Sequence, residues 1–446
     1  MKTSSFTFID LFSGIGGFHA VLSAMGGECV FASEHQKAAA DVYHRNWGIN
    51  PFGDLTNDAN DTIMNVPPHD VLAAGFPCQP FSKSGSQLGM EETRGTLFWN
   101  ILRIIQEHHP KIILLENVRN LAGPRHRHEW GIIVNSLREQ GYRVSDKPSV
   151  FSPHLLPPEM GGRPQFRERI FITATYLGTK ANAAELCADP VVENRPVNGW
   201  DPKLWNLETH LPLEPVHQTS NLQLSDTEKL WIDTWDDFVR IIRSARGDRR
   251  LPGFPLWADS WSPRANFSIP SETPQWKAHI LRKNSDFYCE YQELIDPWAS
   301  KWGLYGESFP SSKRKLEWQA QDATSLWDTI IQFRPSGIRA RTPTYVPALV
   351  AITQTSIWGP QQRRLSTREA ARLQGLPDWF DFGEQTDAKT YRQLGNGVSV
   401  GAVWYVLKAH ARRDEKILKA IAPLLFNTIL SASNNPNDLL QAHELK

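Results

Sequence analysis

Short apolar runs alternate with amphipathic stretches over the first 180 residues of the chain. FTFIDL (6–11) predicts a buried strand, and the apolar positions of FHAVLSAM (18–25) recur at helical spacing. The same order of strand and helix then repeats. Further strands are predicted at 28–34, 70–75, 111–118, 142–151 and 167–177, and further helices at 37–47, 96–108 and 129–141. This alternation favours an α/β fold with a mostly parallel sheet that is covered on both faces.

The regular pattern stops after about Gly178, and the chain up to about Pro335 has no single period. One amphipathic helix is predicted at 225–247, followed by irregular or short-strand structure. Eleven of the 17 tryptophans lie between Trp200 and Trp327, and we expect most of them in a core. The stretch is therefore predicted to be a separate module inserted into the sheet domain, which later helical segments complete.

Composition narrows the class of protein without naming a partner. No apolar run approaches the roughly 20 residues that span a bilayer, and no secretory signal is visible, so we expect a cytoplasmic protein. The formal net charge is zero, so binding to nucleic acid would require basic groups gathered on one surface. The four cysteines lack paired spacing, which argues against a disulfide framework and a zinc site, and no metal is expected.

A glycine-rich turn, FSGIGG (12–17), follows the first strand directly. Such a turn lets a ligand approach the start of a helix, but it serves dinucleotides or simple close packing equally well. Its glycine spacing does not provide the GxGxxG pattern of an NAD-binding oxidoreductase. Two acids near later strand ends add weight to a ligand site: Glu34 could accept hydrogen bonds from ribose hydroxyls, and Asp54 could face an adenine amino group.

GFPCQPFS (75–82) places Cys78 between two prolines at the carboxyl end of a predicted strand, where ligands gather in parallel sheets. A lone cysteine is more often an inert thiol, but here Glu116 ends the neighbouring predicted strand. A thiolate that adds to C6 of cytosine makes C5 nucleophilic, and an acid near N3 stabilises the resulting charge. The pair therefore suits methylation at C5, with Cys29, Cys187 and Cys289 left as structural thiols.

Six blocks in order give the chain a family resemblance: FIDLFSGIGG, GFPCQPFS, ENV, QFRERIFI, RLSTREAARLQGLPD and QLGNGVSV. Together they resemble the motif series of the DNA (cytosine-5) methyltransferase family, of the bacterial restriction-modification type. The resemblance implies a Rossmann-like, S-adenosylmethionine-dependent methyltransferase sheet domain at 1–180 plus 385–446. It also implies an inserted target-recognition domain with its hinge at 181–384.

The resemblance implies roles for individual residues. Cys78 would be the nucleophile, Glu116 would contact N3, Arg169 would contact the cytosine O2, and Arg167 would lie near a phosphate. S-adenosyl-L-methionine would be held by Phe12, Gly14, Gly16, Glu34, His35, Asp54, Leu55, Pro77 and Asn396. His35 departs from the pattern, because several relatives carry there an aromatic residue that stacks on adenine.

Contacts with DNA are implied at three places. The segment 82–96 looks like the family's loop that closes over the flipped base, with Ser82, Ser84 and Gln87 as contacts. Gln165 is a further expected contact. In the insertion, Arg240 and Arg243 belong to a basic stretch that either contacts phosphates or forms a solvated helix face, and 333–351 offers arginines for base recognition.

The implied function is transfer of a methyl group to C5 of a flipped-out cytosine in double-stranded DNA, through a covalent bond between Cys78 and C6. A cognate restriction endonuclease would be a functional partner, and the enzyme is expected to be a monomer. Two alternatives stay open. A tRNA cytosine-5 methyltransferase of the same fold would have a short variable region, whereas the insertion here is long. A catalytically inactive DNA-binding relative would be expected to lack the cysteine or the acid.

Overall fold

The computed structural model describes residues 5–77, 96–215, 220–247, 249–263, 267–350 and 355–440. The chain forms two compact units. Unit 1 comprises Met1–Pro212, Pro347–Thr353 and Thr367–Lys446, and unit 2 comprises Leu213–Val346 and Gln354–Ser366. These bounds differ from the predicted insertion at 181–384, because residues 181–212 and 367–384 pack within unit 1.

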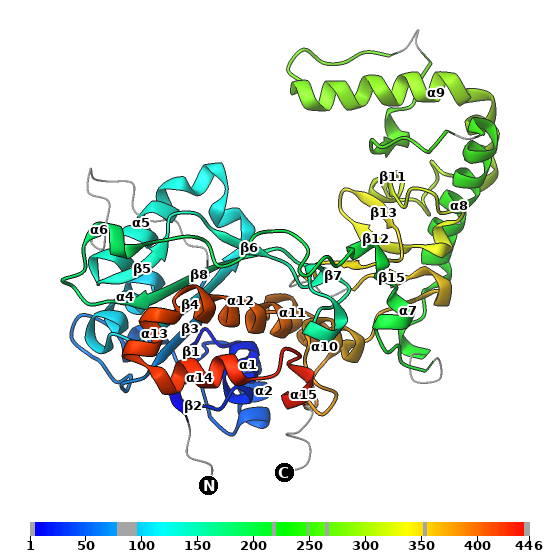
Figure 1. Ribbon diagram of the computed structural model, residues 1–446. Helices are drawn as coiled ribbons and strands as arrows, with labels where there is room; N and C mark the ends of the chain where they lie inside the picture. Colours follow the sequence, from blue (N-terminus) through cyan, green and yellow to red (C-terminus); the bar gives the residue numbers. More distant parts are fainter. Residues whose placement is uncertain are drawn as a thin grey trace. The chain divides into compact units, whose positions relative to one another are not determined.

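Unit 1 is built on an eight-stranded sheet with the order β2-β1-β3-β4-β8-β5-β9, in which β6 also pairs with β8 (Figure 1). The strands of unit 1 are β1 (Phe6–Leu11), β2 (Gly27–Ser33), β3 (Val71–Gly75), β4 (Ile112–Val118), β5 (Tyr142–Ser145), β6 (Ser149–Phe151), β7 (Gln165–Phe166), β8 (Arg169–Tyr176) and β9 (Cys187–Ala188). The first four strands of the order are parallel to one another, and β8 runs antiparallel to β4. This arrangement confirms the predicted mostly parallel main sheet.

Helices connect and cover these strands. The helices of unit 1 are α1 (Gly17–Ala24), α2 (Lys37–Trp47), α3 (Leu55–Asp58), α4 (Leu97–His108), α5 (Arg127–Glu139), α6 (Ala183–Leu186), α7 (Leu207–His210), α10 (Thr367–Gln374), α11 (Asp387–Asn396), α12 (Val400–Arg413), α13 (Glu415–Ile421), α14 (Pro423–Ser431) and α15 (Asn437–Leu440). No described helix combines the length and the apolar composition that crossing a bilayer requires.

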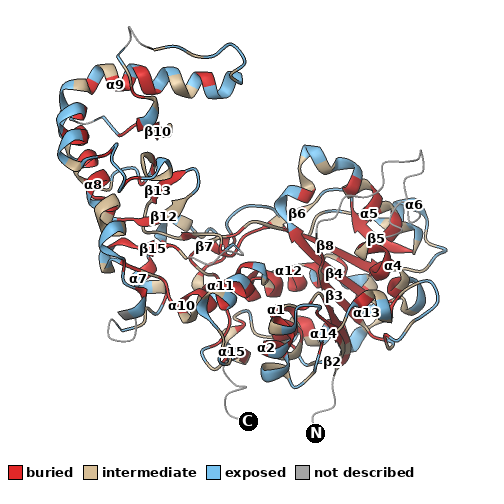
Figure 2. Ribbon diagram, turned by 180° about the vertical axis from the view of Figure 1, so that it is seen from behind, coloured by how far each residue is buried: buried red, intermediate tan, exposed pale blue. Residues whose placement is uncertain are grey.

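Both faces of the main sheet are buried. Alternate residues such as Ile9, Leu72 and Ile113 join the apolar faces of α4 and α5 in one core cluster. The residues between them, including Leu114, point to the opposite face and are buried as well. Figure 2 accordingly shows the central strands in the colour of buried residues. Burial on both faces explains why these strands are continuous apolar runs in the sequence.

One strand prediction was wrong in its extent. Residues 142–151 form two strands, β5 and β6, joined by a turn that contains Pro148. Proline has no N–H to donate to a ladder, which agrees with the break in pairing at this point. Both strands pair antiparallel with β8, one after the other along its length, and the register shifts by two residues between them.

Unit 2 contains a six-stranded sheet with the order β10-β11-β13-β12-β15-β16 and two long helices. Its elements are β10 (Leu256–Trp257), β11 (Lys315–Gln319), β12 (Ile330–Arg334), β13 (Gly337–Arg341), β15 (Ile357–Trp358), β16 (Arg363–Arg364), α8 (Asp226–Arg246) and α9 (Gln275–Trp302). β14 (Val346–Pro347) lies where the chain returns to unit 1.

The helices of unit 2 confirm one prediction and overturn another. α8 matches the predicted amphipathic helix and begins with a capping box between Ser225 and Glu228. The irregular structure expected afterwards is wrong for α9, a helix of 28 residues interrupted by a non-helical Tyr291 and by Pro297. These interruptions break the apolar period.

Of the eleven tryptophans between Trp200 and Trp327, five are buried as expected and three more pack partly buried against the core of unit 2, whereas Trp276 is exposed. Trp235 and Trp298 are in contact within this core.

Candidate functional site

The carboxyl edge of the main sheet gathers the residues that the sequence singled out. β1, β2, β3 and β4 are parallel, so the segments that follow Leu11, Ser33, Gly75 and Val118 all leave the sheet at this edge. β8 is antiparallel, and therefore its first residue, Arg169, enters at the same edge, opposite Val118. Segments that are far apart in the sequence meet here for a topological reason.

The glycine-rich turn after β1 is tight on one side and open on the other. Phe12, Gly14 and Gly16 have φ angles of 53°, 56° and 90°, in the left-handed region that glycine tolerates. A Cβ on Gly16 would lie 2.1 Å from Nε1 of Trp47, whose indole donates a hydrogen bond to the Ile15 carbonyl. A Cβ on Gly14 would have no described atom within 4 Å. The turn therefore leaves space on the side of Gly14.

The Glu34 side chain is hydrogen-bonded to this turn. The residue follows β2, is 7% exposed, and its Oε2 accepts a hydrogen bond of 2.9 Å from the Gly14 N–H. Its Oε1 accepts a second bond, of 2.8 Å, from the Gln36 N–H. His35 lies beside it, with a ring that is 70% exposed and Nδ1 3.4 Å from Oε1. The predicted acid thus faces the predicted glycine turn.

Asp54 and Leu55 lie at the start of α3. Asp54 caps this short helix, because its Oδ1 accepts hydrogen bonds from the N–H and the hydroxyl of Thr56. These bonds lower the pKa of Asp54, and the nearby His35 adds to the effect. Leu55 is buried beneath the cap. Pro77 and Asn396 are both exposed, at the end of the segment after β3 and at the last residue of α11, respectively.

Glu116 and Arg169 form a buried ion pair at the sheet edge. Oε1 of Glu116 lies 3.0 Å from Nε of Arg169, and the carboxyl group is 7% exposed. Burial raises the pKa of Glu116, against the opposing effect of the Arg169 and Arg167 charges. Glu116 is also opposite Gly75 in the parallel pairing of β3 and β4. The acid is therefore placed next to the strand that leads to the predicted nucleophile.

Asn117 is a site residue that the sequence interpretation did not single out. Its side-chain amide donates a hydrogen bond of 2.9 Å to the Phe76 carbonyl, two residues before Cys78 in the chain. The residue was visible in the ENV block, but only the folded chain shows that its amide holds the end of β3. Cys78, Ser82, Ser84 and Gln87 lie outside the described residues.

Arg167 requires a correction, because its side chain does not face solvent where a phosphate would bind. It is 1% exposed, and its Nη atoms donate hydrogen bonds to the carbonyls of Leu349, Gly395 and Gly397. A guanidinium buried among backbone carbonyls of its own unit does not agree with the predicted phosphate contact. Instead it holds the two residues that flank Asn396.

Gln165 is likewise buried. It is 0% exposed, and neither its Oε1 nor its Nε2 has a hydrogen-bond partner in the described part of the chain. A direct contact with DNA, as expected from the resemblance, does not agree with this position.

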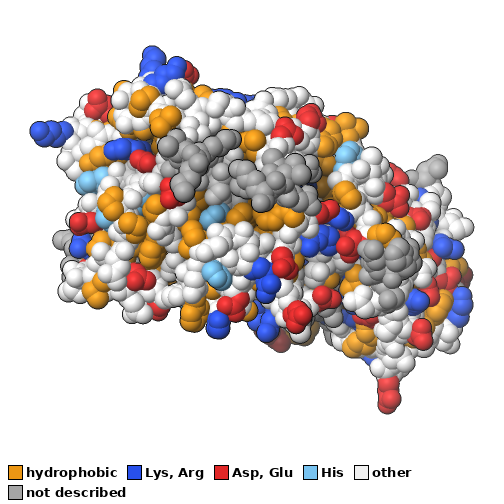
Figure 3. All heavy atoms as spheres, turned by 90° about the horizontal axis from the view of Figure 1, so that it is seen from below, with side chains coloured by type: hydrophobic (Ala, Val, Ile, Leu, Met, Phe, Trp, Pro, Cys, Tyr) orange, Lys and Arg blue, Asp and Glu red, His pale blue; other side chains and the backbone are white. Residues whose placement is uncertain are grey.

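In unit 2, the predicted phosphate-binding arginines of α8 have partners of their own. Arg240 pairs with Asp236 one turn away at 2.9 Å, and Arg243 donates to the Gln321 carbonyl at 3.4 Å. On the face of the molecule in Figure 3, basic and acidic side chains are interspersed, in keeping with the net charge of zero. A role of Arg240 and Arg243 in DNA binding stays a prediction.

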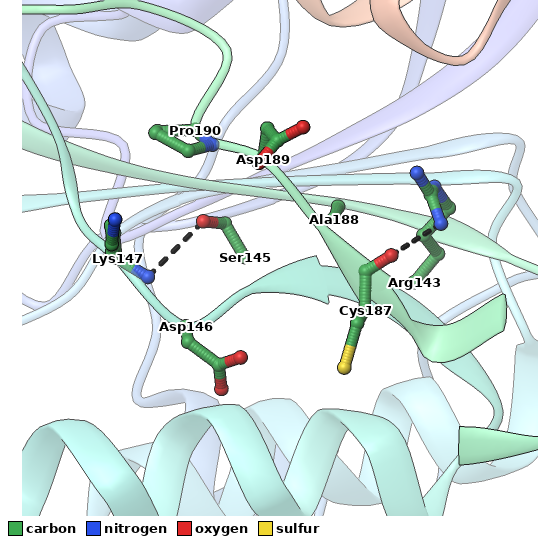
Figure 4. A pocket seen from close by; sticks show the side chains of 8 residues that line it. All are labelled: Arg143, Ser145, Asp146, Lys147, Cys187, Ala188, Asp189 and Pro190. Carbon is green, nitrogen blue, oxygen red and sulfur yellow. Dashed lines mark hydrogen bonds between the residues drawn. The ribbon is translucent and has the colours of Figure 1, made fainter. Parts of the chain in front are cut away.

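A pocket at the β5 and β9 end of the sheet contains none of the predicted site residues (Figure 4). The guanidinium group of its Arg143 already donates hydrogen bonds to the Asp414 carboxylate and to the carbonyls of Glu185 and Cys187. Among the described thiols, Cys187 is exposed, whereas burial raises the pKa of Cys29 to about 12. Neither the pocket nor the Cys29 thiol offers chemistry comparable to that of the sheet edge.

Comparison with known proteins agrees with this geometry. The family profile of the C-5 cytosine-specific DNA methylases matches residues 6–412. The chain is 49% identical over 489 residues to the type II methyltransferase M.AluI of Cellulosimicrobium cellulans, covering 93% of this chain and 94% of that protein. It is 44% identical over 401 residues to the type II methyltransferase M.HhaI of Haemophilus parahaemolyticus, covering 90% and 92%. The chain belongs to the family of C-5 cytosine-specific DNA methylases.

Proposed function

We propose that this DNA (cytosine-5) methyltransferase modifies a flipped-out cytosine in double-stranded DNA, with Cys78 as its nucleophile and Glu116 as the acid at N3. The observation that carries this assignment is the buried pair of Glu116 and Arg169, one strand away from the segment that leads to Cys78. A target base inside a duplex is out of reach of such an edge, so the base must leave the stack.

The cofactor of the family, S-adenosylmethionine, fits the residues around the glycine turn. The space beside Gly14 admits a ligand, and the buried Glu34 carboxylate lies at its rim. We assign the binding of the cofactor to Phe12, Gly14, Gly16, Glu34, His35, Asp54, Leu55, Pro77 and Asn396. When bound, S-adenosylmethionine supplies a methyl group activated by its sulfonium charge.

Each side chain at the sheet edge is assigned one part of the reaction. The Cys78 thiolate forms a bond to C6, the C5–C6 electron pair becomes available at C5, and the Glu116 carboxyl group donates its proton to N3. The raised pKa of Glu116 favours the protonated form that this step needs. Arg169, held by Glu116, would donate to the O2 atom of the base. After the methyl group has been transferred to C5, the C5 proton passes to solvent water, the C6–S bond breaks, and the N3 proton returns to Glu116, which restores the aromatic ring, the thiolate and the acid.

Unit 2 is proposed to recognise the DNA sequence. It contains most of the long insertion between the blocks QFRERIFI and RLSTREAARLQGLPD, where the family resemblance implies a target-recognition domain. The names of the type II relatives support a role beside a cognate restriction endonuclease. The expected cytoplasmic location and the expected monomeric state stay predictions.

Bisulfite sequencing of DNA from cells that express the protein tests the proposal, with Cys78→Ala as the matched control. Methylcytosine confined to one short sequence with the wild type, and absent with Cys78→Ala, is the expected result. If neither strain methylates DNA while the wild type binds S-adenosylmethionine, the substrate assignment is wrong and RNA becomes the next candidate.

A further inference from the structure

The sheet of unit 2 has one apolar and one polar face. Along β11, β12 and β13, alternate side chains such as Leu316, Ile331 and Ile338 enter the core that α8 and α9 complete. The side chains between them point the other way, and except for the buried Ile330 they are partly or fully exposed. This polar sheet face consists of Lys315, Glu317, Gln319, Gln332, Arg334, Arg339 and Arg341.

The strand register brings these side chains into rows. Arg339 of the central strand β13 lies between Glu317 of β11 and Gln332 of β12. Arg341 lies beside Gln319, and its Nε donates a hydrogen bond of 2.9 Å to the Gln319 Oε1. Arg339 donates from Nε to the Glu317 Oε2 at 2.6 Å. Two guanidinium groups are therefore oriented side by side before any ligand arrives.

Positive charge on this face exceeds negative charge. Within β11, β12 and β13, three arginines and Lys315 share the polar sheet face with one carboxylate, that of Glu317. Burial lowers the pKa values of Arg334 and Arg341, and the positive charge of Arg339 lowers them further. Arg334 and Arg339 are diagonal neighbours on β12 and β13, and their like charges repel each other. A polyanion bound at this face would offset that repulsion.

The basic stretch of α8 and the loop after it is less suited to a polyanion. Arg240, Arg249 and Arg250 are each paired with an acid of unit 2, at 2.9, 3.5 and 3.0 Å, respectively. Three arginines of this stretch are thus matched by acids, whereas on the polar sheet face only Arg339 has an acid partner, Glu317, among the described residues. Of the two surfaces, the sheet face is therefore the better candidate for contact with DNA.

We infer that the polar sheet face is the surface of unit 2 that contacts duplex DNA, with Arg339 and Arg341 at base edges and Arg334 at the phosphate backbone. The inference rests on the proposed function, since it assumes that the chain acts on double-stranded DNA. A guanidinium group held in place by Glu317 or Gln319 can present two parallel N–H groups to the acceptors of a guanine edge. Pre-orientation also reduces the entropy lost when the contact forms.

Three substitutions of single arginines test the inference in the full-length enzyme. The target duplex is first identified by bisulfite mapping with the wild type. Arg341→Gln and Arg339→Gln should then lower kcat/KM on that duplex by roughly 10- to 100-fold and relax the specificity at one base pair each. Arg334→Gln should weaken binding to all duplexes alike and reduce the salt dependence of Kd by about one phosphate contact. Arg282→Gln, at an exposed position of α9, is the matched control and should leave both quantities near wild type.

Binding of S-adenosylmethionine, measured by calorimetry, reports that each variant is folded. Where Arg341→Gln is poorly folded, Arg341→Lys replaces it, because lysine keeps the charge but loses the planar fork. Wild-type affinity and specificity in Arg339→Gln and Arg341→Gln would overturn the inference and leave the proposed function standing. Loss of binding to a structured RNA, with binding to DNA unchanged, would overturn it as well. Failure of the wild type to methylate DNA would instead count against the proposed function.

Discussion

Oε1 of Glu116 lies 3.0 Å from Nε of Arg169, on two antiparallel strands that meet at the carboxyl edge of the main sheet. The two residues are separated by 53 positions in the sequence, and the register of β4 and β8 brings them together. A carboxyl group in this position is shielded from water yet held by a cation. It is thereby kept in place for hydrogen bonding to a base, while burial favours its protonated form.

The pH dependence of methylation should show whether Glu116 is the acid that the reaction needs. Because burial raises its pKa, the wild type should lose single-turnover methylation rate as the pH rises through that raised value. Glu116→Gln should lower the rate roughly 100-fold or more and abolish this alkaline limb. An alkaline limb that persists in Glu116→Gln would show that another group titrates.

The same raised pKa has a consequence for stability, which also depends on the protonated form of Glu116. The folded state holds the Glu116 proton more tightly than the unfolded state, so its contribution to stability is complete below the ordinary pKa of 4.5. That contribution is lost as the pH rises through the folded-state value. Binding of S-adenosylmethionine by Glu116→Gln serves as the control that the unit remains folded.

Arg167→Met should impair the site more than a comparable change at Arg163. Arg167 binds the carbonyls of Gly395 and Gly397 on either side of Asn396, whereas Arg163 binds Arg372 and Asn437 away from the cofactor residues. Each loss of a buried guanidinium should destabilise unit 1 by about 3 kcal/mol. Only Arg167→Met should also raise KM for S-adenosylmethionine, by roughly tenfold, since it frees the Asn396 segment.

Thermal unfolding and initial-rate kinetics separate the two effects. Equal changes of KM in Arg167→Met and Arg163→Met, at equal loss of stability, would reduce Arg167 to a purely structural residue. Arg167→Lys should recover part of the affinity, because one ammonium group can still donate to a carbonyl.

Two glycines of the turn should respond differently to alanine. Gly16→Ala would place a methyl group against the Trp47 indole, which its hydrogen bond to Ile15 and its stacking on His19 hold in place. The variant should therefore be unstable. Gly14→Ala should cost only about 1–2 kcal/mol of stability for its left-handed backbone.

Affinity for S-adenosylmethionine distinguishes the two glycines further. In Gly14→Ala the methyl group enters the open side of the turn, so the Kd should rise although the protein stays folded. Isothermal titration beside thermal unfolding provides both quantities. Unchanged affinity in a folded Gly14→Ala protein would place the cofactor away from the turn.

Acid should destabilise unit 1 partly through His69. Burial lowers the pKa of this residue from 6.5 to about 4. Between these two pH values the unfolded chain therefore binds a proton at His69 that the folded chain does not bind. The stability contributed above pH 6.5 is lost as the pH falls toward 4, and about 2 kcal/mol of it should be gone near pH 5.

Urea unfolding at neutral pH and near pH 5 measures this loss. His69→Gln should make the unfolding free energy less dependent on pH in this range. His44→Gln, on the exposed side of α2, should leave the dependence as it is in the wild type. The hypothesis fails if both variants have the pH dependence of the wild type.

The sequence alone determined the order of strands and helices in unit 1, the family, and the residue types at the sheet edge. These follow from signals a few residues long: the period of apolar positions, the glycines after β1, and the blocks around Cys78 and Glu116. Each signal is local, and therefore readable without knowledge of the rest of the chain.

Only the tertiary structure decided which partners these residues have. Arg167 lies in a block that suggests contact with a ligand, yet its partners are carbonyls 182 and more positions away, and they withdraw it from solvent. Similarly, the pairing of Arg339 with Glu317 depends on the register of β11 and β13, while the arginines of α8 find acids elsewhere in their unit. The energy of a charged group depends on its burial and on the charges around it, which chain folding sets over long sequence distances.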